Sequence, residues 1–317
     1  MPKSVLIVGG SGFLGTHLGL RLREEYRVYS TYLTRNLKIP GVSNLPLDVG
    51  NRALLRKIIG IAKPDVIVYL VNGGPDLRDM VQLEKLHTEG AANITNVPEA
   101  SHSHFIYLSS AMVFDGSRGN YRETDASIPN TLLGRAKVSG ENFLRSRSTH
   151  MLVIRSSPVF GRGNPFHLST LDRIRMSLDR GRTLELNDHH LHSFAPVTGL
   201  VDVLSKVISS MTVSSGPAAK TSLKNRTLHY GGLTKVSLAE FARVFAKRYR
   251  YDPKLILPQA ISTRAARTQM VVGDIGMSHP GDFSLNSSAT IELLKTKPFL
   301  LEEGFDLIDQ KLVVSLG

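Results

Sequence analysis

The first half of the chain alternates short apolar runs with longer segments in which apolar residues recur every three or four positions. The short runs predict strands at residues 4–8, 28–32, 66–71, 105–108 and 152–154. The longer segments predict helices at residues 12–25, 52–62, 80–100 and 131–144. The runs at 66–71 and 105–108 are almost continuously apolar, as in parallel strands that helices cover on both faces. The pattern therefore predicts a doubly wound, Rossmann-type α/β fold.

Beyond residue 160 the alternation becomes irregular, and the chain is rich in Gly, Pro, Asn and His. This region is expected to contain loops at residues 187–196 and 212–222, and helices at 238–249 and 290–294. We expect no internal repeat.

Two units are expected from this change of pattern. The first is a dinucleotide-binding domain over residues 1–160, completed by a return segment near 195–235. The second is a small C-terminal substrate-binding lobe built from residues 161–194 and 236–317.

Composition narrows the class of protein. The 317 residues are 41% hydrophobic and include no cysteine, which excludes disulfides, thiolate metal sites and a cysteine nucleophile. No apolar run approaches the ~20 residues that span a bilayer, and the first run is too short for a signal-peptide core. We expect a cytoplasmic protein that does not associate with membranes.

The formal charge of +12 favours an anionic ligand. Residues 1–150 hold 18 basic and 13 acidic side chains, and residues 151–317 hold 21 and 14. The basic residues form no unbroken tract and are not interleaved with aromatic residues, so we expect no nucleic-acid partner. Binding to nucleic acid would instead predict association with duplex DNA that weakens steeply with salt.

A glycine-rich segment directly follows the first predicted strand and opens the first predicted helix. It reads Gly9-Gly10-Ser11-Gly12-Phe13-Leu14-Gly15. Glycines at these positions permit a tight turn and let the backbone approach a diphosphate at the helix N-terminus. We expect a dinucleotide to contact Gly9, Gly12, Phe13, Leu14 and Gly15.

The second predicted strand indicates which dinucleotide is preferred. An acidic residue at its end would bind a ribose 2′-hydroxyl, whereas an arginine accommodates a 2′-phosphate. Residues 29–35 contain no acid and end at Arg35. NADP is therefore expected as the cofactor, with NAD as the alternative if Arg35 is only a solvated surface charge.

Several motifs resemble the extended branch of the short-chain dehydrogenase/reductase superfamily. The glycine spacing, Leu47-Asp48-Val49 and the segment KPDVIV at 63–68 are similar to that branch. FIYLSS at 105–110, VFDG at 113–116, YRETD at 121–125, GRAKVSGE at 134–141 and HPGDFSLN at 279–286 resemble dTDP-4-dehydrorhamnose reductases. The resemblance spans nearly the whole chain, is most specific over 105–141, and implies that Asp48 and Val49 contact the adenine.

The resemblance also implies a hydride transfer from the nicotinamide to the C4 ketone of a nucleotide sugar. Ser110 would hold the carbonyl, and Lys137 would bind the nicotinamide ribose and lower the pKa of a catalytic tyrosine. That tyrosine is expected at position 133, where this chain has Leu133. Leucine has no proton to donate, and losing a general acid costs roughly 10²–10⁴ in rate.

Other hydroxyl groups lie near Leu133 in the sequence. The alternative proton donors are Tyr121, Tyr107 and Ser109. Tyr121 also matches an aromatic residue of the family's loop, and Tyr107 belongs to a predicted buried strand. Two further departures from the reductases are His87, where the family has Asn, and Ala111-Met112 in place of Asp-Tyr.

The substrate contacts implied by the resemblance come from the region after residue 160. Arg162, Arg173 and Arg175 are the candidates for binding a diphosphate, with surface charges as the alternative for each. Asp188, His189, His190 and His192 have a spacing that could ligate a metal, but the related loop has none, and we expect no metal site.

Two functions remain open. The chain is either an NADP-preferring relative of nucleotide-sugar reductases, impaired by Leu133, or a catalytically silent dinucleotide-binding sensor or regulatory subunit. The regulatory β subunit of methionine adenosyltransferase belongs to the same family and illustrates the second case. The expected partners are accordingly a nucleotide-sugar substrate or none, and a second copy in a homodimer or a partner enzyme.

Overall fold

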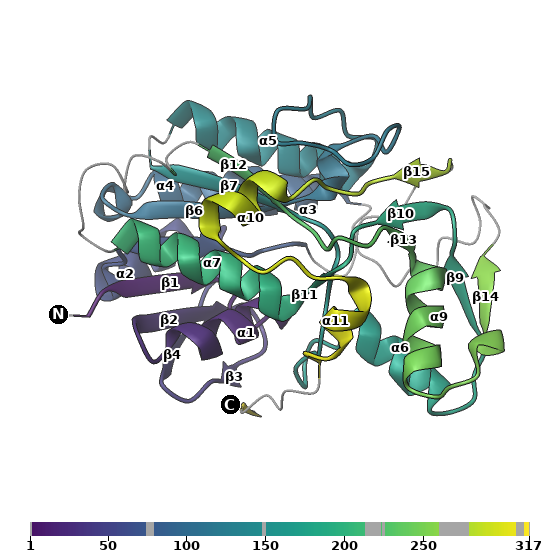
Figure 1. The fold of residues 1–317 in the computed structure, drawn as a ribbon. Helices are drawn as coiled ribbons and strands as arrows, with labels where there is room; N and C mark the ends of the chain where they lie inside the picture. The colour runs from purple at the N-terminus through teal and green to yellow at the C-terminus, as the bar shows by residue number, and fades with distance from the viewer. Residues whose placement is uncertain are drawn as a thin grey trace.

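A parallel sheet of seven strands forms the centre of the molecule (Figure 1). The computed structural model describes residues 2–73, 79–147, 150–212, 223, 226–259, 279–308 and 314–316. Across the sheet the strands are β12 (Arg226–Tyr230), β7 (Met151–Ser156), β6 (His104–Ser110), β5 (Val66–Tyr69), β1 (Ser4–Val8), β2 (Arg27–Tyr32) and β4 (Val42–Pro46). All neighbouring strands are parallel, which confirms the predicted doubly wound α/β class.

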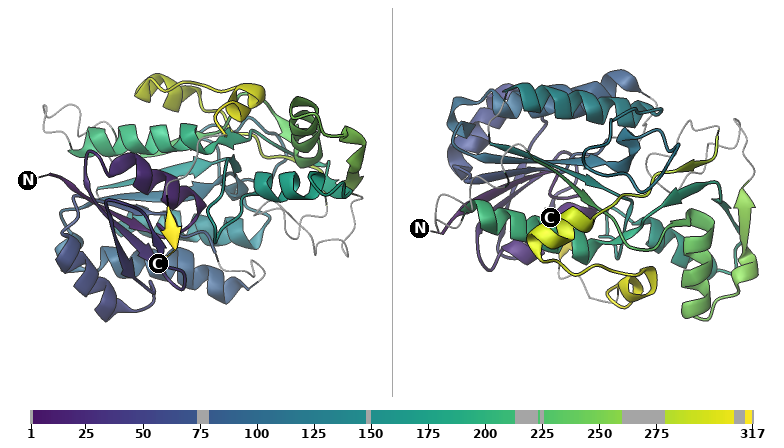
Figure 2. Two further views of the ribbon diagram at one scale, coloured as in Figure 1. Left: turned by 90° about the horizontal axis from the view of Figure 1, so that it is seen from below. Right: turned by 45° about the horizontal axis from the view of Figure 1, so that its top comes forward.

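Helices cover both faces of this sheet, and the right-hand view of Figure 2 shows the strands between the two layers. One layer contains α1 (Phe13–Leu22) and α7 (Val197–Thr212), and the other contains α2 (Arg52–Ala62), α4 (Gly90–Thr95) and α5 (Leu132–Arg147). Because successive side chains of a strand point to opposite faces, Val5 and Ile7 of β1 pack into the first layer. Leu6 and Val8 pack into the second.

The predicted helix at 80–100 is interrupted. The chain forms α3 (Met80–Glu84), the π-helix η1 (Lys85–Glu89), α4 and the 3₁₀ helix η2 (Pro98–Ala100). A π turn leaves main-chain carbonyls without their α-helical partners. Tyr69 of β5 donates to the carbonyl oxygen of Leu86 at 2.5 Å, and Tyr107 of β6 donates to that of His87 at 3.4 Å. Two tyrosines on adjacent strands thus donate hydrogen bonds to carbonyl oxygens of the widened turn.

A smaller unit lies beside the carboxyl end of the sheet. Its aromatic core is shared by Phe160, Phe194, Phe241, Phe245 and Phe305, whose rings contact one another. Its elements are α6 (Thr170–Leu178), α9 (Leu238–Arg248), α11 (Leu301–Phe305), β9 (Leu184–Asn187), β10 (His190–His192), β13 (Val236–Ser237), β14 (Ile256–Gln259), β15 (Gly281–Asp282) and the 3₁₀ helix η4 (Pro253–Leu255). The structure confirms the predicted helix at 238–249.

The prediction of a loop at 187–196 is wrong in part. It contains β10, which pairs with β13 and β15, and β11 (Ala195–Pro196), which pairs with β8 (Val159–Phe160). These strands form through partners distant in the sequence, which a local pattern does not reveal. Of the loop predicted at 212–222, Thr212 ends α7 and the remaining residues lie outside the described part of the chain.

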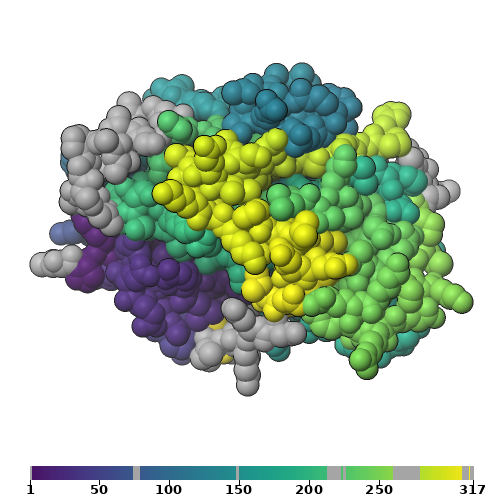
Figure 3. Space-filling model, in the orientation of Figure 1, coloured from purple at the N-terminus to yellow at the C-terminus, as the bar shows by residue number. Residues whose placement is uncertain are grey.

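The C-terminal residues join the two parts of the molecule. Figure 3 shows residues 279–308 crossing one face, where α10 (Ser288–Leu294) contacts β12 and α11 contacts α9. The predicted helix at 290–294 is confirmed as part of α10. Hydrogen bonds from Gly231 N to Ser287 Oγ (2.8 Å) and from Leu301 N to Thr234 Oγ1 (3.0 Å) attach this segment. A short antiparallel pair joins β3 (Leu37–Lys38) and β16 (Ser315–Leu316).

A buried ion pair crosses the layer between α5 and the sheet. Arg155 of β7 donates to Glu141 of α5 from Nε at 3.0 Å and from Nη2 at 2.7 Å, and both side chains are at most 4% exposed. A second arginine, the partly exposed Arg145, donates to the same carboxylate over 3.1 Å. The guanidinium of Arg155 holds the pKa of Glu141 below its usual range although burial opposes this.

We predict that Arg155→Met lowers the free energy of unfolding by about 3–5 kcal/mol, because it leaves the Glu141 carboxylate buried without its main partner. Arg145→Met is the matched control. Its guanidinium binds the same carboxylate but is 37% exposed, so the expected loss is below about 1 kcal/mol. Urea unfolding monitored by circular dichroism measures both values, and equal losses would contradict the prediction.

Candidate dinucleotide and substrate site

The glycine loop joins the end of β1 to the start of α1. Gly9 has a φ of +84°, which favours glycine, and a Cβ on Gly15 would lie only 2.5 Å from the Cα of Gly10. Thr31 of β2 fixes the loop by accepting from Gly9 N at 3.1 Å and from Ser11 N at 3.2 Å. Gly12 is the N-cap residue of α1 and provides no side-chain cap, so the helix N-terminus is suited to bind an anion.

Asp48 and Val49 follow β4, two strands away from β1. Asp48 is exposed, and its Oδ1 accepts from Gly50 N at 2.8 Å. The Val49 side chain is buried in the core, and its carbonyl accepts from Asn93 Nδ2 at 3.0 Å. Of these two residues, Asp48 therefore has its side chain at the surface, and Val49 does not.

Arg35 lies just beyond β2 and is held by a distant part of the chain. Its Nη1 donates to the carbonyl oxygen of Phe166 at 3.0 Å, and its guanidinium carbon lies 5.6 Å from the centre of the Phe166 ring. The side chain is exposed but oriented. This contact distinguishes Arg35 from a freely solvated charge.

The segment 162–167, which we call the clip, binds directly to the glycine loop. Asn164 is 2% exposed, and its Nδ2 donates to Ser11 O at 3.0 Å and to Thr16 Oγ1 at 2.8 Å. The Oδ1 of Asn164 accepts from the amides of Phe166 and His167, both at 2.9 Å. The sequence did not predict that Asn164 binds the glycine loop, because its partners Ser11 and Thr16 lie about 150 residues away in the chain.

We predict that Asn164→Asp lowers the free energy of unfolding by about 2–4 kcal/mol. The substitution replaces a buried donor by a carboxylate oxygen facing the oxygen atoms of Ser11 and Thr16. Asn130→Asp is the control, because Asn130 also donates to a carbonyl, that of Asp115, but is exposed. Thermal or urea unfolding should show less than about 1 kcal/mol for the control, and a similar value for Asn164→Asp would contradict the prediction.

Ser110 is the last residue of β6, and the amine of Lys137 reaches the same end of the strand from α5. The Ser110 hydroxyl accepts from Met112 N at 3.2 Å and so caps the 3₁₀ helix η3 (Ala111–Val113). Lys137 of α5 is 1% exposed, and its Nζ donates to Leu108 O at 2.8 Å and Val71 O at 3.4 Å. The lysine amine is thus bound by the main chain at the ends of β5 and β6.

Leu133 lies one turn before Lys137 on α5. It is 3% exposed and packs in a small apolar cluster with Leu83 of α3 and Ala136, against which Met80 also packs. The position at which the resemblance predicts a catalytic phenol is therefore filled by apolar contacts between α3 and α5.

Burial changes the acid–base properties of the groups around Lys137. It lowers the pKa of the Lys137 amine to about 7, although the charge on Glu141 opposes this. Burial and the Lys137 charge hold the pKa of His87 well below its usual range, and His87 Nε2 lies 3.2 Å from Asn72 O. Tyr107, whose ring lies 5.3 Å from Lys137 Nζ, has its pKa raised well above its usual value by burial.

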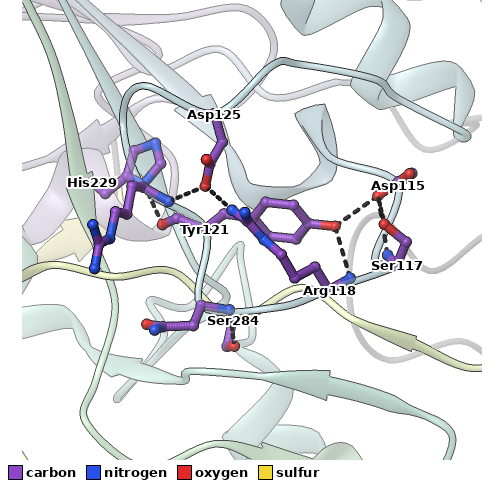
Figure 4. Close-up of polar contacts among 9 residues, drawn as sticks. Asp115, Ser117, Arg118, Tyr121, Asp125, His229 and Ser284 are labelled. Atoms are coloured by element: carbon purple, nitrogen blue, oxygen red, sulfur yellow. Dashed lines mark hydrogen bonds and ion pairs between the residues drawn. The ribbon is translucent and has the colours of Figure 1, made fainter.

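The other tyrosine considered, Tyr121, is bound in a different loop. Figure 4 shows its hydroxyl group pointing to Asp115, with an O–O distance of 2.6 Å. The Tyr121 ring stacks on Phe114 with 4.1 Å between ring centres, and its carbonyl lies 3.0 Å from His229 Nδ1. Its amide donates to Ser284 O at 2.9 Å, so this loop ties the end of β6 to the segment after β15.

We predict that the stability lost in Lys137→Met grows as the pH rises from 7 to 10. Between these values the unfolded lysine binds a proton that the folded one has largely released, so the folded wild type gains stability with pH. The expected slope of the difference approaches about 1.4 kcal/mol per pH unit. Urea unfolding at several pH values measures it, with the exposed Lys57→Met as control, and a flat difference would rule out the shift.

The three arginines proposed for a diphosphate are not equivalent. Arg162 and Arg173 are exposed near the start of α6. Arg175 lies over the rings of Phe245 and Tyr249, with its guanidinium carbon 5.8 and 5.9 Å from their centres. The structure therefore places Arg175 in the contact between α6 and α9, apart from the other two.

The histidine-rich segment makes contacts within the small unit. His189 Nε2 lies 2.9 Å from Gln259 O, and His190 Nε2 lies 2.9 Å from His279 O. His192 stacks on Phe283, and Asp188 accepts from Ser237 Oγ at 2.5 Å. Within the described residues, no group of three side chains has the arrangement of a metal site.

The helices in the described part of the chain include none with the length and apolar character of a membrane span.

Fold and site together define a Rossmann-type protein with a glycine loop suited to bind a diphosphate. Residues 3–272 match the RmlD substrate binding domain family, and the chain belongs to this family. Among curated proteins, it is 25% identical over 244 residues to a dTDP-4-dehydrorhamnose reductase from Aggregatibacter actinomycetemcomitans, covering 75% of this chain and 76% of that protein. It is 25% identical over 285 residues to methionine adenosyltransferase 2 subunit beta from Danio rerio, covering 84% and 80%.

Solved structures share the fold over nearly the whole chain. A hypothetical dTDP-4-dehydrorhamnose reductase from Sulfolobus tokodaii aligns with a TM-score of 0.74 and 22% identity, covering 95% of this chain and 99% of that one. A dTDP-4-dehydrorhamnose reductase from Bacillus anthracis, determined in complex with NADP, aligns with a TM-score of 0.73 and 17% identity, covering 97% and 98%. At these identities the likenesses show that the fold is shared.

Proposed function

We propose that this protein binds NADP(H) and acts as a dinucleotide-responsive sensor or regulatory subunit instead of turning over a nucleotide sugar. One observation carries the proposal. Leu133 is buried against Leu83 where the reductases have a phenol, beside a Lys137 amine that the main chain already binds. A hydride transfer to a ketone needs a proton for the developing alkoxide, and leucine cannot supply it.

Dinucleotide binding is supported by the first half of the chain. The glycine loop gives the diphosphate a helix N-terminus without a side-chain cap, and Asp48 at the end of β4 is accessible to the adenine part. Arg35 provides a cation for a 2′-phosphate, which favours NADP over NAD. The Bacillus anthracis relative was determined with NADP, whereas a Bordetella bronchiseptica relative of similar fold was determined with NAD.

A slow reductase is the second candidate, because Ser110 and Lys137 are both present at the end of β6. When bound, the nicotinamide would supply the hydride. Ser110 would orient the C4 carbonyl, Lys137 would bind the nicotinamide ribose, and Arg162 with Arg173 would bind the diphosphate of a nucleotide sugar. In that case water would deliver the proton, at the cost in rate that loss of a general acid implies.

The regulatory role requires a second protein, which is either a partner enzyme or another copy of this chain. The relative from Danio rerio is, by its name, a subunit beta. Its alignment covers 84% of this chain, so we extend the subunit role to this protein as part of the proposal.

We predict that the wild type and Leu133→Tyr both bind NADPH while neither oxidises it above the blank when given a dTDP-4-keto-6-deoxysugar. A phenol at 133 would still lie among Leu83 and Met80, beside an amine bound by Leu108 O. Fluorescence titration measures binding, and absorbance at the NADPH band measures turnover.

Leu133→Phe is the matched control, since it adds the same ring without the hydroxyl group. A large gain in rate in Leu133→Tyr and not in Leu133→Phe would show a dormant reductase and contradict the silent role. NADPH turnover by the wild type would also contradict the silent role, and it would favour the slow reductase. Absence of NADPH binding in the wild type would overturn both.

A further inference from the structure

The clip contributes side chains from the second half of the chain to the surroundings of the glycine loop. Residues 162–167 lie between β8 and α6, and Asn164 binds them to Ser11 and Thr16. His17 of α1 adds a second link, since its Nε2 lies 2.8 Å from Arg162 O. The clip therefore stands against the N-terminus of α1, where the diphosphate of a dinucleotide is expected.

The clip is itself held in one conformation. A bridge joins Asn164 to His167 within the clip, and Asp172 of α6 accepts from Gly163 N at 2.7 Å. A Cβ on Gly163 would also collide with the His167 carbonyl. Phe166 is thus presented from a hydrogen-bonded turn, and its ring and its carbonyl both contact Arg35.

Arg35 uses only part of its donor capacity on the clip. The Nη1 atom binds Phe166 O, and Arg35 makes no other hydrogen bond to a described residue. A guanidinium has five N–H donors, so Nε and Nη2 can still bind an anion. Because the end of β2 is where Rossmann proteins contact the adenosine ribose, that anion would be a 2′-phosphate.

We propose that Phe166 is a specificity-determining residue of the dinucleotide site, which sets the preference for NADP over NAD by holding Arg35 in position for the 2′-phosphate. This inference rests on the proposed dinucleotide binding. Phe166 is a positioning residue, because it acts on the ligand through Arg35. Ordering an arginine before the ligand arrives removes the entropic cost of ordering it on binding, and only a ligand with a 2′-phosphate gains from this.

The size of the effect follows from the contact that is lost. Phe166→Leu keeps the carbonyl and an apolar side chain but removes the aromatic face. A cation–π contact at an exposed site corresponds to about a two- to fivefold change in affinity. We expect that loss for NADP and an unchanged affinity for NAD. Arg35→Gln removes the charge itself and should weaken NADP binding on the order of tenfold or more.

The test measures dissociation constants for NADP and NAD by isothermal titration calorimetry in four proteins: wild type, Phe166→Leu, Arg35→Gln and the double variant. If Phe166 acts through Arg35, Phe166→Leu lowers the ratio of NADP to NAD affinity in the wild type and leaves it unchanged in the Arg35→Gln background. Phe299→Leu is the control, because Lys297 lies over that ring at 5.3 Å, outside the dinucleotide site.

Each other outcome has a definite meaning. A Phe166→Leu variant that loses affinity for NADP and NAD equally, or that shows the same loss without Arg35, overturns the inference while dinucleotide binding stands. A wild type that binds neither dinucleotide overturns the proposed function instead. Thermal unfolding of each variant identifies any loss of affinity that comes from misfolding, and Phe166→Ala provides a second, larger truncation if Phe166→Leu shows a small change.

Discussion

Charge buried between α5 and the central sheet is the constraint on which the architecture of this protein depends. Glu141 and Lys137 lie one turn apart on α5, and each must find partners in a layer that water does not reach. Arg155 of β7 pairs with Glu141, and the main chain at the ends of β5 and β6 accepts from Lys137. A buried charge without a partner is strongly destabilising, so these contacts fix α5 on the sheet.

The same constraint shapes the neighbouring helices. Tyr69 and Tyr107 project from the sheet into this layer, and their hydroxyl groups need acceptors there. The π-helix η1 provides them in the carbonyls of Leu86 and His87. The helix from residue 80 is thereby widened at His87, and α3 reaches α5 with Leu83 against Leu133. The apolar cluster around Leu133 therefore follows from the way α3 packs against α5.

The two parts of the molecule meet at the candidate dinucleotide site as well as along the C-terminal segment. Asn164 binds the clip to the glycine loop, and Phe166 orients Arg35, so residues beyond 160 complete a site that begins at Gly9. A dinucleotide bound at this proposed site would contact both parts at once. That arrangement supports the proposed role, in which dinucleotide binding would be communicated to a second protein.

The sequence by itself determined the parallel sheet, the glycine loop and the departure at Leu133, because these depend on local periodicity, on backbone freedom at glycine and on residue identity. It did not predict the π-helix, strand β10 or the clip, nor that Arg175 turns toward Phe245. Each of these depends on contacts between residues far apart in the chain: Tyr69 with Leu86, Leu191 with Ser237, and Asn164 with Ser11. Only the tertiary structure decided them, since a buried polar group takes whichever partner the packed layers bring within reach.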